Sequence, residues 1–100
     1  MARVPSFLAR LEHNDPDFAN RIADIIAFAE ADGALDAKTK TLMSLVGDAI
    51  LNHPEGVTAL AALARRQGAT EEEIAETVRM VFMIAGIPAL ATAQHAFRDQ

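Results

Sequence analysis

Apolar residues recur every three or four positions along almost the whole chain, the spacing that places side chains on one face of an α-helix. No stretch shows the strict alternation of apolar and polar residues that is typical of a half-buried strand. Turn and capping signals divide the pattern into about six segments joined by short connections. The sequence therefore predicts an all-α fold of about six helices, in a single domain that covers residues 1–100.

Each segment begins at a residue that commonly caps or opens a helix. Asp15, Asp36 and His53 each precede a helical pattern, and a proline follows Asp15 and His53 at the first helical position. Thr70 and Glu73 have the spacing of a capping box. The predicted helices run from about Pro5 to Asn14, Asp15 to Gly33, Asp36 to Asn52, His53 to Gly68, Thr70 to Ala85 and Pro88 to Phe97.

The helix predicted over residues 70–85 is apolar almost all round near its end, because Met80, Met83 and Ile84 lie outside its main apolar stripe. A helix of this kind is buried on more than one side. Apolar residues make up 51% of the chain, and the excess lies in the second half, which indicates buried contacts between subunits. We therefore expect a homo-oligomer. Lys38 and Lys40, on the polar side of their helix, are expected to stay in solvent.

The composition argues against several classes of function. A net charge of −5 disfavours a nucleic-acid partner, which requires a basic stripe. The chain has no cysteine, so neither a disulfide nor thiol catalysis is available, and we expect no metal site and no cofactor. The longest apolar run, residues 81–91, is far shorter than the about 18 residues that span a bilayer, and no apolar signal segment opens the chain. We expect a cytoplasmic protein with no membrane partner.

Three segments, "LDAKTKTLM" (35–43), "ALARRQGATEEEIAETV" (62–78) and "AGIPALATA" (85–93), together resemble the carboxymuconolactone decarboxylase and alkylhydroperoxidase D-like (AhpD-like) family. They occur in the family's order with its gaps, and the resemblance covers most of the chain, from Phe7 to Phe97. It implies an all-helical domain that assembles with copies of itself, as a trimer or a hexamer.

Peroxidase-type members of this family carry a glutamate on the third helix, a C-x-x-C pair at the start of the next helix and a histidine one turn later. In the register set by residues 68–70, the glutamate position falls on Thr41 and the two cysteine positions fall on His53 and Gly56. The histidine position falls on Leu60. Because a thiolate is the nucleophile in this chemistry, the sequence predicts no thiol peroxidase activity.

The decarboxylase branch of the family lacks the cysteine pair and acts on a carboxylated lactone. The resemblance therefore implies a small carboxylated organic molecule as the ligand, with decarboxylation or a related proton transfer as the reaction. His53 and Glu55 are the ionisable residues at the helix start and are the candidate catalytic groups. Arg79, which could hold the carboxylate, Thr41 and Leu60 are the candidate substrate-binding residues.

Each candidate also has an interpretation that involves no chemistry. His53 suits an N-cap position before a proline, Glu55 complements the positive end of the helix dipole, and Arg79 could pair with a glutamate of its own helix. For Asp48, which interrupts an apolar stretch, a solvent or interface position is favoured over catalysis. The alternative function is a non-catalytic oligomeric scaffold or binding protein that has lost the family's active site.

Overall fold

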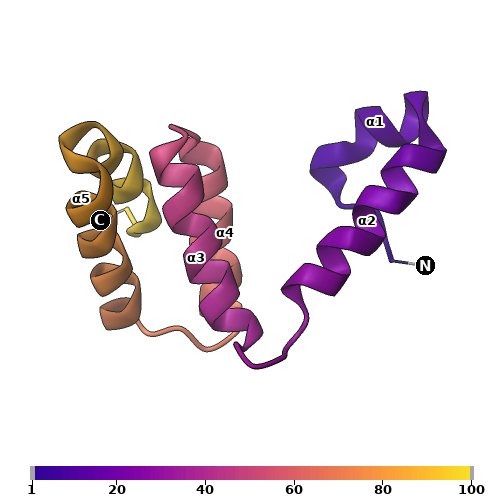
Figure 1. Ribbon diagram of the computed structural model, residues 1–100. Coiled ribbons are helices and arrows are strands. Elements are labelled where there is room, and N and C mark those ends of the chain that lie inside the picture. The colour runs from indigo at the N-terminus through magenta and orange to yellow at the C-terminus, as the bar shows by residue number, and fades with distance from the viewer. Residues whose placement is uncertain (1, 100) are drawn as a thin grey trace. The chain divides into compact units, whose positions relative to one another are not determined.

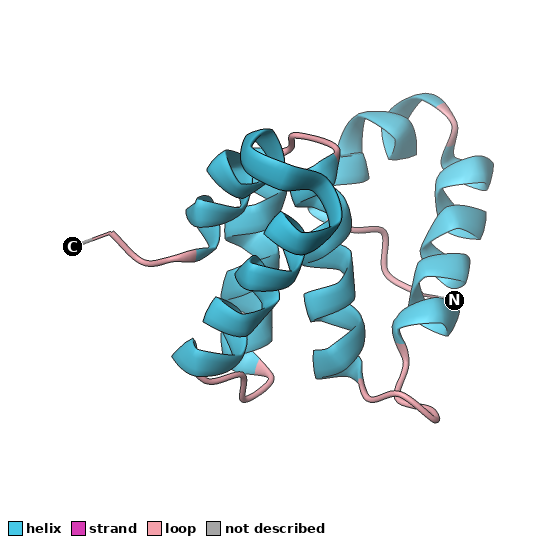
Figure 2. Cartoon of the chain, turned by 60° about the vertical axis from the view of Figure 1, so that its left-hand side comes forward, coloured by secondary structure: helices cyan, strands magenta, loops and turns pink. Residues whose placement is uncertain are grey.

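The structure is a computed structural model that describes residues 2–99, and every regular element in that range is helical (Figure 2). The prediction of an all-α fold is confirmed. One turn of 3₁₀ helix precedes α1 (Ser6–Leu8) and another follows α5 (Gln94–Ala96). The five α-helices within the described range are α1 (Ala9–Asn14), α2 (Pro16–Glu30), α3 (Ala37–Ile50), α4 (Pro54–Arg66) and α5 (Glu71–Ala93).

The chain divides into two compact units, the first ending at Gly33 and the second beginning at Ala34. In the first unit, α1 packs against α2, and the backbone N–H of Ala2 donates a hydrogen bond to Asp24 Oδ1 (2.7 Å). The expectation of a single domain over residues 1–100 stays a prediction.

Local capping chemistry sets the start of α2. The N–H of Phe18 donates to Asp15 Oδ1 (3.2 Å), and Pro16 is the first helical residue, as predicted. The predicted end at Gly33 is wrong: α2 ends at Glu30, because the backbone of Ala31 is already extended (φ −63°, ψ 150°).

In the second unit, α3, α4 and α5 lie side by side around one hydrophobic core (Figure 1). The largest fully buried side chains are Leu45, Val57, Ile74 and Val81. Most of the remaining core is alanine, a small side chain that lets helix axes approach closely. The buried alanines of this core are Ala49, Ala61, Ala64, Ala69, Ala89, Ala93 and Ala96.

Short turns connect the three helices, and their signals are local. Asn52 adopts a left-handed backbone conformation (φ 63°) between α3 and α4, as predicted. Gly68 does the same after α4 (φ 97°). The capping box that opens α5 is confirmed, because Thr70 N–H donates to Glu73 Oε1 (2.8 Å) and Glu73 N–H donates to Thr70 Oγ1 (3.0 Å).

Helix α5 contains the break that separates the two last predicted helices. Gly86 has φ 80° and ψ −162°, values outside the helical range, and Pro88 follows two residues later. The predicted count of about six helices becomes five because helical structure resumes at once after this single residue. The last predicted helix also ends early: regular α-helix stops at Ala93, and a 3₁₀ turn follows it.

An ion pair that the helical pattern did not predict joins α3 to α5. Lys38 Nζ donates to Glu73 Oε2 (2.9 Å), so the Lys38 side chain is half-buried and the expectation that it stays in solvent is wrong. The hydrogen bond and charge of Glu73 raise the pKa of Lys38. Reciprocally, the hydrogen bond from Lys38, together with the capping bond from Thr70, lowers the pKa of Glu73.

Helix α5 with its following turn, Glu71–Ala96, is long and apolar enough to cross a membrane by length and composition, and 22% of its most apolar window is buried within the chain. The core helix of a soluble protein meets the same criterion. A cytoplasmic location and the absence of a membrane partner stay predictions.

The lowered pKa of Glu73 predicts how stability depends on pH. The unfolded chain binds the proton more readily than the folded chain, so the stabilisation is complete above the ordinary glutamate pKa of 4.5 and is lost as the pH falls through the lower folded value. Glu71, with a pKa lowered by its hydrogen bonds from Arg65, acts in the same direction.

We expect the melting temperature to fall as the pH is lowered from about 7 to about 3, and to fall less in Glu73→Gln. Glutamine keeps an oxygen that can cap Thr70 but removes the charge that pairs with Lys38. Glu76→Gln, at an exposed position on the same helix, is the control. An equal loss of stability in wild type and Glu73→Gln would contradict this assignment.

Candidate functional site

The candidate catalytic histidine lies at the start of α4, beside a carboxylate from the end of α3. His53 occupies the N-cap position with its side chain 64% exposed, and it makes no side-chain capping hydrogen bond. Its Nδ1 atom lies 4.0 Å from Asp48 Oδ1. The backbone N–H of His53 donates to the carbonyl oxygen of Asp48 (2.9 Å). Asp48 therefore faces His53 through both its backbone and its side chain.

The carboxylate of Asp48 also occupies the space beside Gly56, in the first turn of α4. A Cβ atom built on Gly56 would collide with Asp48 Oδ2 and lie 3.0 Å from Asp48 Cγ. The side chain of Asp48 thus fills the volume that a larger residue at position 56 would use. Sequence analysis favoured a solvent or interface position for Asp48; its one available signal was a carboxylate five residues before His53.

The other candidates near α4 differ in exposure. Glu55 is exposed in the first turn of α4, where its charge is favourable at the helix N-terminus. Thr41 is buried in α3, with 8% of its surface exposed. Leu60 is half-buried and packs against the core.

Arg79 lies elsewhere, at a surface cavity of about 560 Å³ on α5. Apart from the exposed guanidinium of Arg79, all the residues that line this cavity are apolar. Neither His53 nor Glu55 lines it, so the structure does not bring Arg79 together with the two candidate acid–base groups in one cavity. The apolar lining residues are Ala75, Val78, Phe82, Met83, Leu90 and Phe97.

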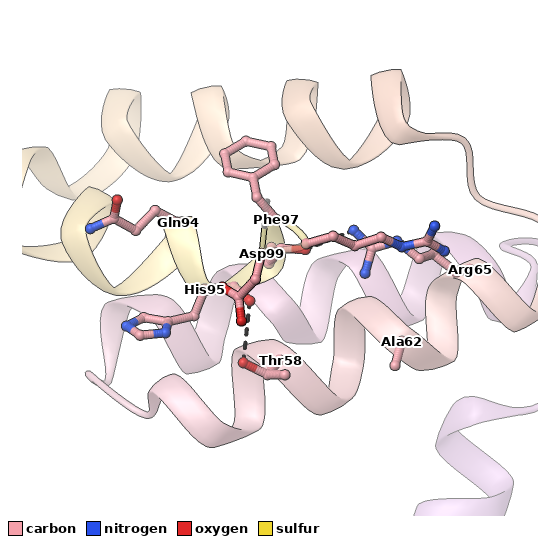
Figure 3. Close-up of a pocket in the computed structure, with 9 residues that line it drawn as sticks. Thr58, Ala62, Arg65, Gln94, His95, Phe97 and Asp99 are labelled. Carbon is pink, nitrogen blue, oxygen red and sulfur yellow. Dashed lines mark hydrogen bonds between the residues drawn. The ribbon is translucent and has the colours of Figure 1, made fainter.

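A second cavity, of about 510 Å³ and more polar, lies between α4 and the C-terminal turn (Figure 3). The hydroxyl of Thr58 lies 3.2 Å from the carbonyl oxygens of both Pro54 and His95. Arg65, which lines the cavity from the end of α4, is the residue that holds this corner together.

The Arg65 side chain is only 14% exposed and makes three hydrogen bonds. Its Nε and Nη2 atoms donate to the two carboxylate oxygens of Glu71 (2.8 Å each), and Nη2 also donates to the carbonyl oxygen of Ala96 (2.9 Å). The bond to Glu71 raises the pKa of Arg65 and lowers that of Glu71. These bonds connect the end of α4 to the start of α5 and to the turn that follows α5.

Within residues 2–99, no group of three or more histidine and acidic side chains is arranged to hold a metal ion. The arrangement at the start of α4 offers an imidazole beside a carboxylate, a pair suited to proton transfer.

The sequence and the fold together identify the family to which the chain belongs. The model of the carboxymuconolactone decarboxylase family matches residues 16–99. The chain belongs to this family.

A crystal structure of a carboxymuconolactone decarboxylase family protein from Legionella pneumophila, in its apo form, is similar over most of its length. The TM-score is 0.83 at 28% sequence identity, and the match covers 91% of this chain and 81% of that one. No curated protein matches the sequence.

The contact between Asp48 and Gly56 predicts that the effect of Gly56→Ala on stability depends on the side chain at position 48. In an ordinary helix, Gly→Ala stabilises by about 0.5–1 kcal/mol. We expect Gly56→Ala to give no such gain in wild type, because the new methyl group displaces the Asp48 carboxylate. In an Asp48→Ala background, Gly56→Ala should stabilise the chain by about that amount.

Urea unfolding of the four proteins of this double-mutant cycle measures the coupling. Gly47→Ala, where a Cβ meets nothing within 4 Å, is the matched control and should stabilise both backgrounds equally. A gain from Gly56→Ala that is the same with and without Asp48 would show that the two residues do not compete for space.

Proposed function

We propose that this family member binds a small organic acid in the apolar cavity beside Arg79. The observation that carries the proposal is the placement of one exposed guanidinium at a cavity whose other lining residues are apolar. An aromatic or unsaturated ring would pack against Phe82, Met83 and Phe97, while its carboxylate would accept hydrogen bonds from Arg79. Family membership supports a carboxylated ligand as the class.

For catalysis, we propose His53 and Glu55 as the acid–base groups. They lie at the start of α4 and outside the cavity beside Arg79, so conversion requires the substrate to reach them there. In a decarboxylation, the bond from the substrate carbon to its carboxylate breaks and carbon dioxide leaves. The electron pair stays on the carbon, which takes a proton from the protein, and water restores that proton. A solvent-exposed imidazole beside a carboxylate is suited to deliver it. Thr41 and Leu60 remain candidate binding residues.

We further propose that the chain has no thiol peroxidase activity. Peroxide reduction by this route needs a thiolate and a second thiol to form the disulfide, and the sequence contains no cysteine.

A second candidate function is a binding protein or oligomeric scaffold without catalysis. Leu60 favours it, because this apolar side chain packs against the core where the peroxidase pattern has a histidine. The two candidates differ in whether a bound acid is converted.

The protein is proposed to act as a homo-oligomer, with a trimer or a hexamer as the expected states. Large apolar side chains on α5 are more than half exposed in the single chain, namely Met80, Met83, Ile84 and Ile87. A patch of this kind normally marks an interface. A second copy of the chain is the proposed occupant.

Arg79→Gln is expected to weaken the binding of benzoate about tenfold, which corresponds to about 1.4 kcal/mol. Uncharged benzamide, which offers no carboxylate, should bind wild type and variant alike. Isothermal titration calorimetry measures both, and Arg66→Gln is the control for the loss of one surface charge. Equal benzoate affinity in wild type and Arg79→Gln would exclude this cavity as the carboxylate site.

Turnover distinguishes the two candidate functions. If carbon dioxide is released from any of a set of carboxylated lactones, His53→Gln should lower kcat by about 100-fold or more while leaving ligand affinity unchanged. Binding without any release of carbon dioxide would leave the scaffold or binding protein as the function.

Ile84→Glu is expected to convert the oligomer to smaller species, because it places a charge in the proposed interface and outside the proposed ligand cavity. Native mass spectrometry, with a denatured sample as reference, counts the subunits and detects any bound acid. Gln67→Glu adds the same charge at an exposed polar position and should leave the assembly intact. A monomeric wild-type protein would refute the interface.

A further inference from the structure

Asp48 is in a position to decide which nitrogen of His53 carries the proton. Its carbonyl oxygen accepts the backbone N–H of His53 at 2.9 Å, which fixes the histidine backbone at the turn between α3 and α4. Its carboxylate also faces the side chain of the same residue, with Oδ1 4.0 Å from Nδ1. A neutral imidazole donates through only one nitrogen, and the hydrogen bond made at one nitrogen sets the state of the other.

We propose that Asp48 is the positioning residue of the site: it holds His53 in the tautomer protonated at Nδ1, so that Nε2 presents its lone pair to solvent and ligand. The separation of 4.0 Å is longer than a hydrogen bond, so the proposal requires the exposed imidazole to turn toward the carboxylate. Bonds of this kind are often long in ligand-free structures and shorten when the ligand binds. This inference rests on the proposed function, in which His53 transfers the proton.

Gly56 is the second half of this arrangement. The Asp48 carboxylate reaches His53 from a volume that any Cβ at position 56 would invade, since the built Cβ collides with Oδ2. The absence of a side chain at Gly56 is therefore what allows the carboxylate to stand against the first turn of α4. The positioning residue and the glycine act together, and a change at either one should release the imidazole.

The surrounding charges do not provide another partner for Nδ1 among the described contacts. Glu55, in the first turn of α4, is the other carboxylate near the helix start, and its side chain is exposed. His95, from the turn after α5, faces α4 through its carbonyl oxygen, which lies 3.2 Å from the Thr58 hydroxyl. Asp48 is thus the carboxylate that the geometry assigns to His53.

The test is a long-range ¹H–¹⁵N correlation spectrum of the full-length protein labelled with ¹⁵N-histidine, at a pH where the imidazole is neutral. His53→Gln identifies the signals of His53 among the three histidines. In wild type, the form protonated at Nδ1 should be the major tautomer of His53. In Asp48→Ala it should become the minor one, as in a free imidazole side chain.

Two further variants show whether the tautomer of His53 depends on the acceptor oxygen of residue 48 or on the negative charges near the imidazole. Asp48→Asn keeps an oxygen that accepts from Nδ1, so the wild-type tautomer should persist. Glu55→Gln, which removes the neighbouring carboxylate, should also leave the tautomer of His53 unchanged. A major tautomer protonated at Nε2 in wild type, or the same tautomer ratio in wild type and Asp48→Ala, overturns the proposal.

If Asp48→Ala does not fold, Gly56→Ala provides the same test with both side chains of the pair retained. Its methyl group pushes the carboxylate away, and the tautomer protonated at Nδ1 should again become the minor form; an unchanged ratio overturns the proposal. The tautomer readout needs no ligand. A protein that shows the expected tautomers but converts no acid would lose the proposed catalysis and keep the positioning role of Asp48.

Discussion

The close packing of α3 against α4 through alanine is the constraint on which the rest of the second unit depends. Ala49, Ala61 and Ala64 are completely buried, and small side chains at a helix contact allow the backbones to approach. The short turn after α3, in which the N–H of His53 donates to the carbonyl oxygen of Asp48, brings the end of α3 against the first turn of α4. There the Asp48 carboxylate occupies the space that a side chain at residue 56 would otherwise take, and its Oδ1 lies 4.0 Å from His53 Nδ1.

Because the core is built largely of alanine, larger apolar side chains remain exposed elsewhere in the chain. Alanine buries little apolar area, and the stabilisation from burial scales with that area. Larger side chains such as Phe28 and Met83 remain 86% and 74% exposed in the single chain. The close helix packing beside the candidate site and the exposed apolar surface are therefore two results of the same distribution of small and large residues along the helices.

Sequence reasoning was accurate where the signal is local. Asp15 and Asp36 cap helices with residues three positions away, and Thr70 with Glu73 forms the predicted box, because capping depends on neighbours in the chain. It failed where partners are distant. Lys38 bonds a glutamate 35 residues away, and Arg65 reaches a carbonyl 31 residues away. The pairing of Asp48 with Gly56 was missed because it depends on how closely two helices approach, which no spacing rule reports.

At Gly86, other L-amino acids are excluded by the backbone torsion angles and not by a lack of space. A Cβ at this position would meet nothing within 4 Å, yet the backbone at φ 80° and ψ −162° lies in a region that is essentially reserved for glycine. These angles are the mirror image of an extended conformation that every L-residue adopts easily. In a chain made by chemical synthesis, D-alanine at position 86 would therefore adopt these backbone angles without torsional strain, whereas L-alanine would be strained there even though its Cβ has room.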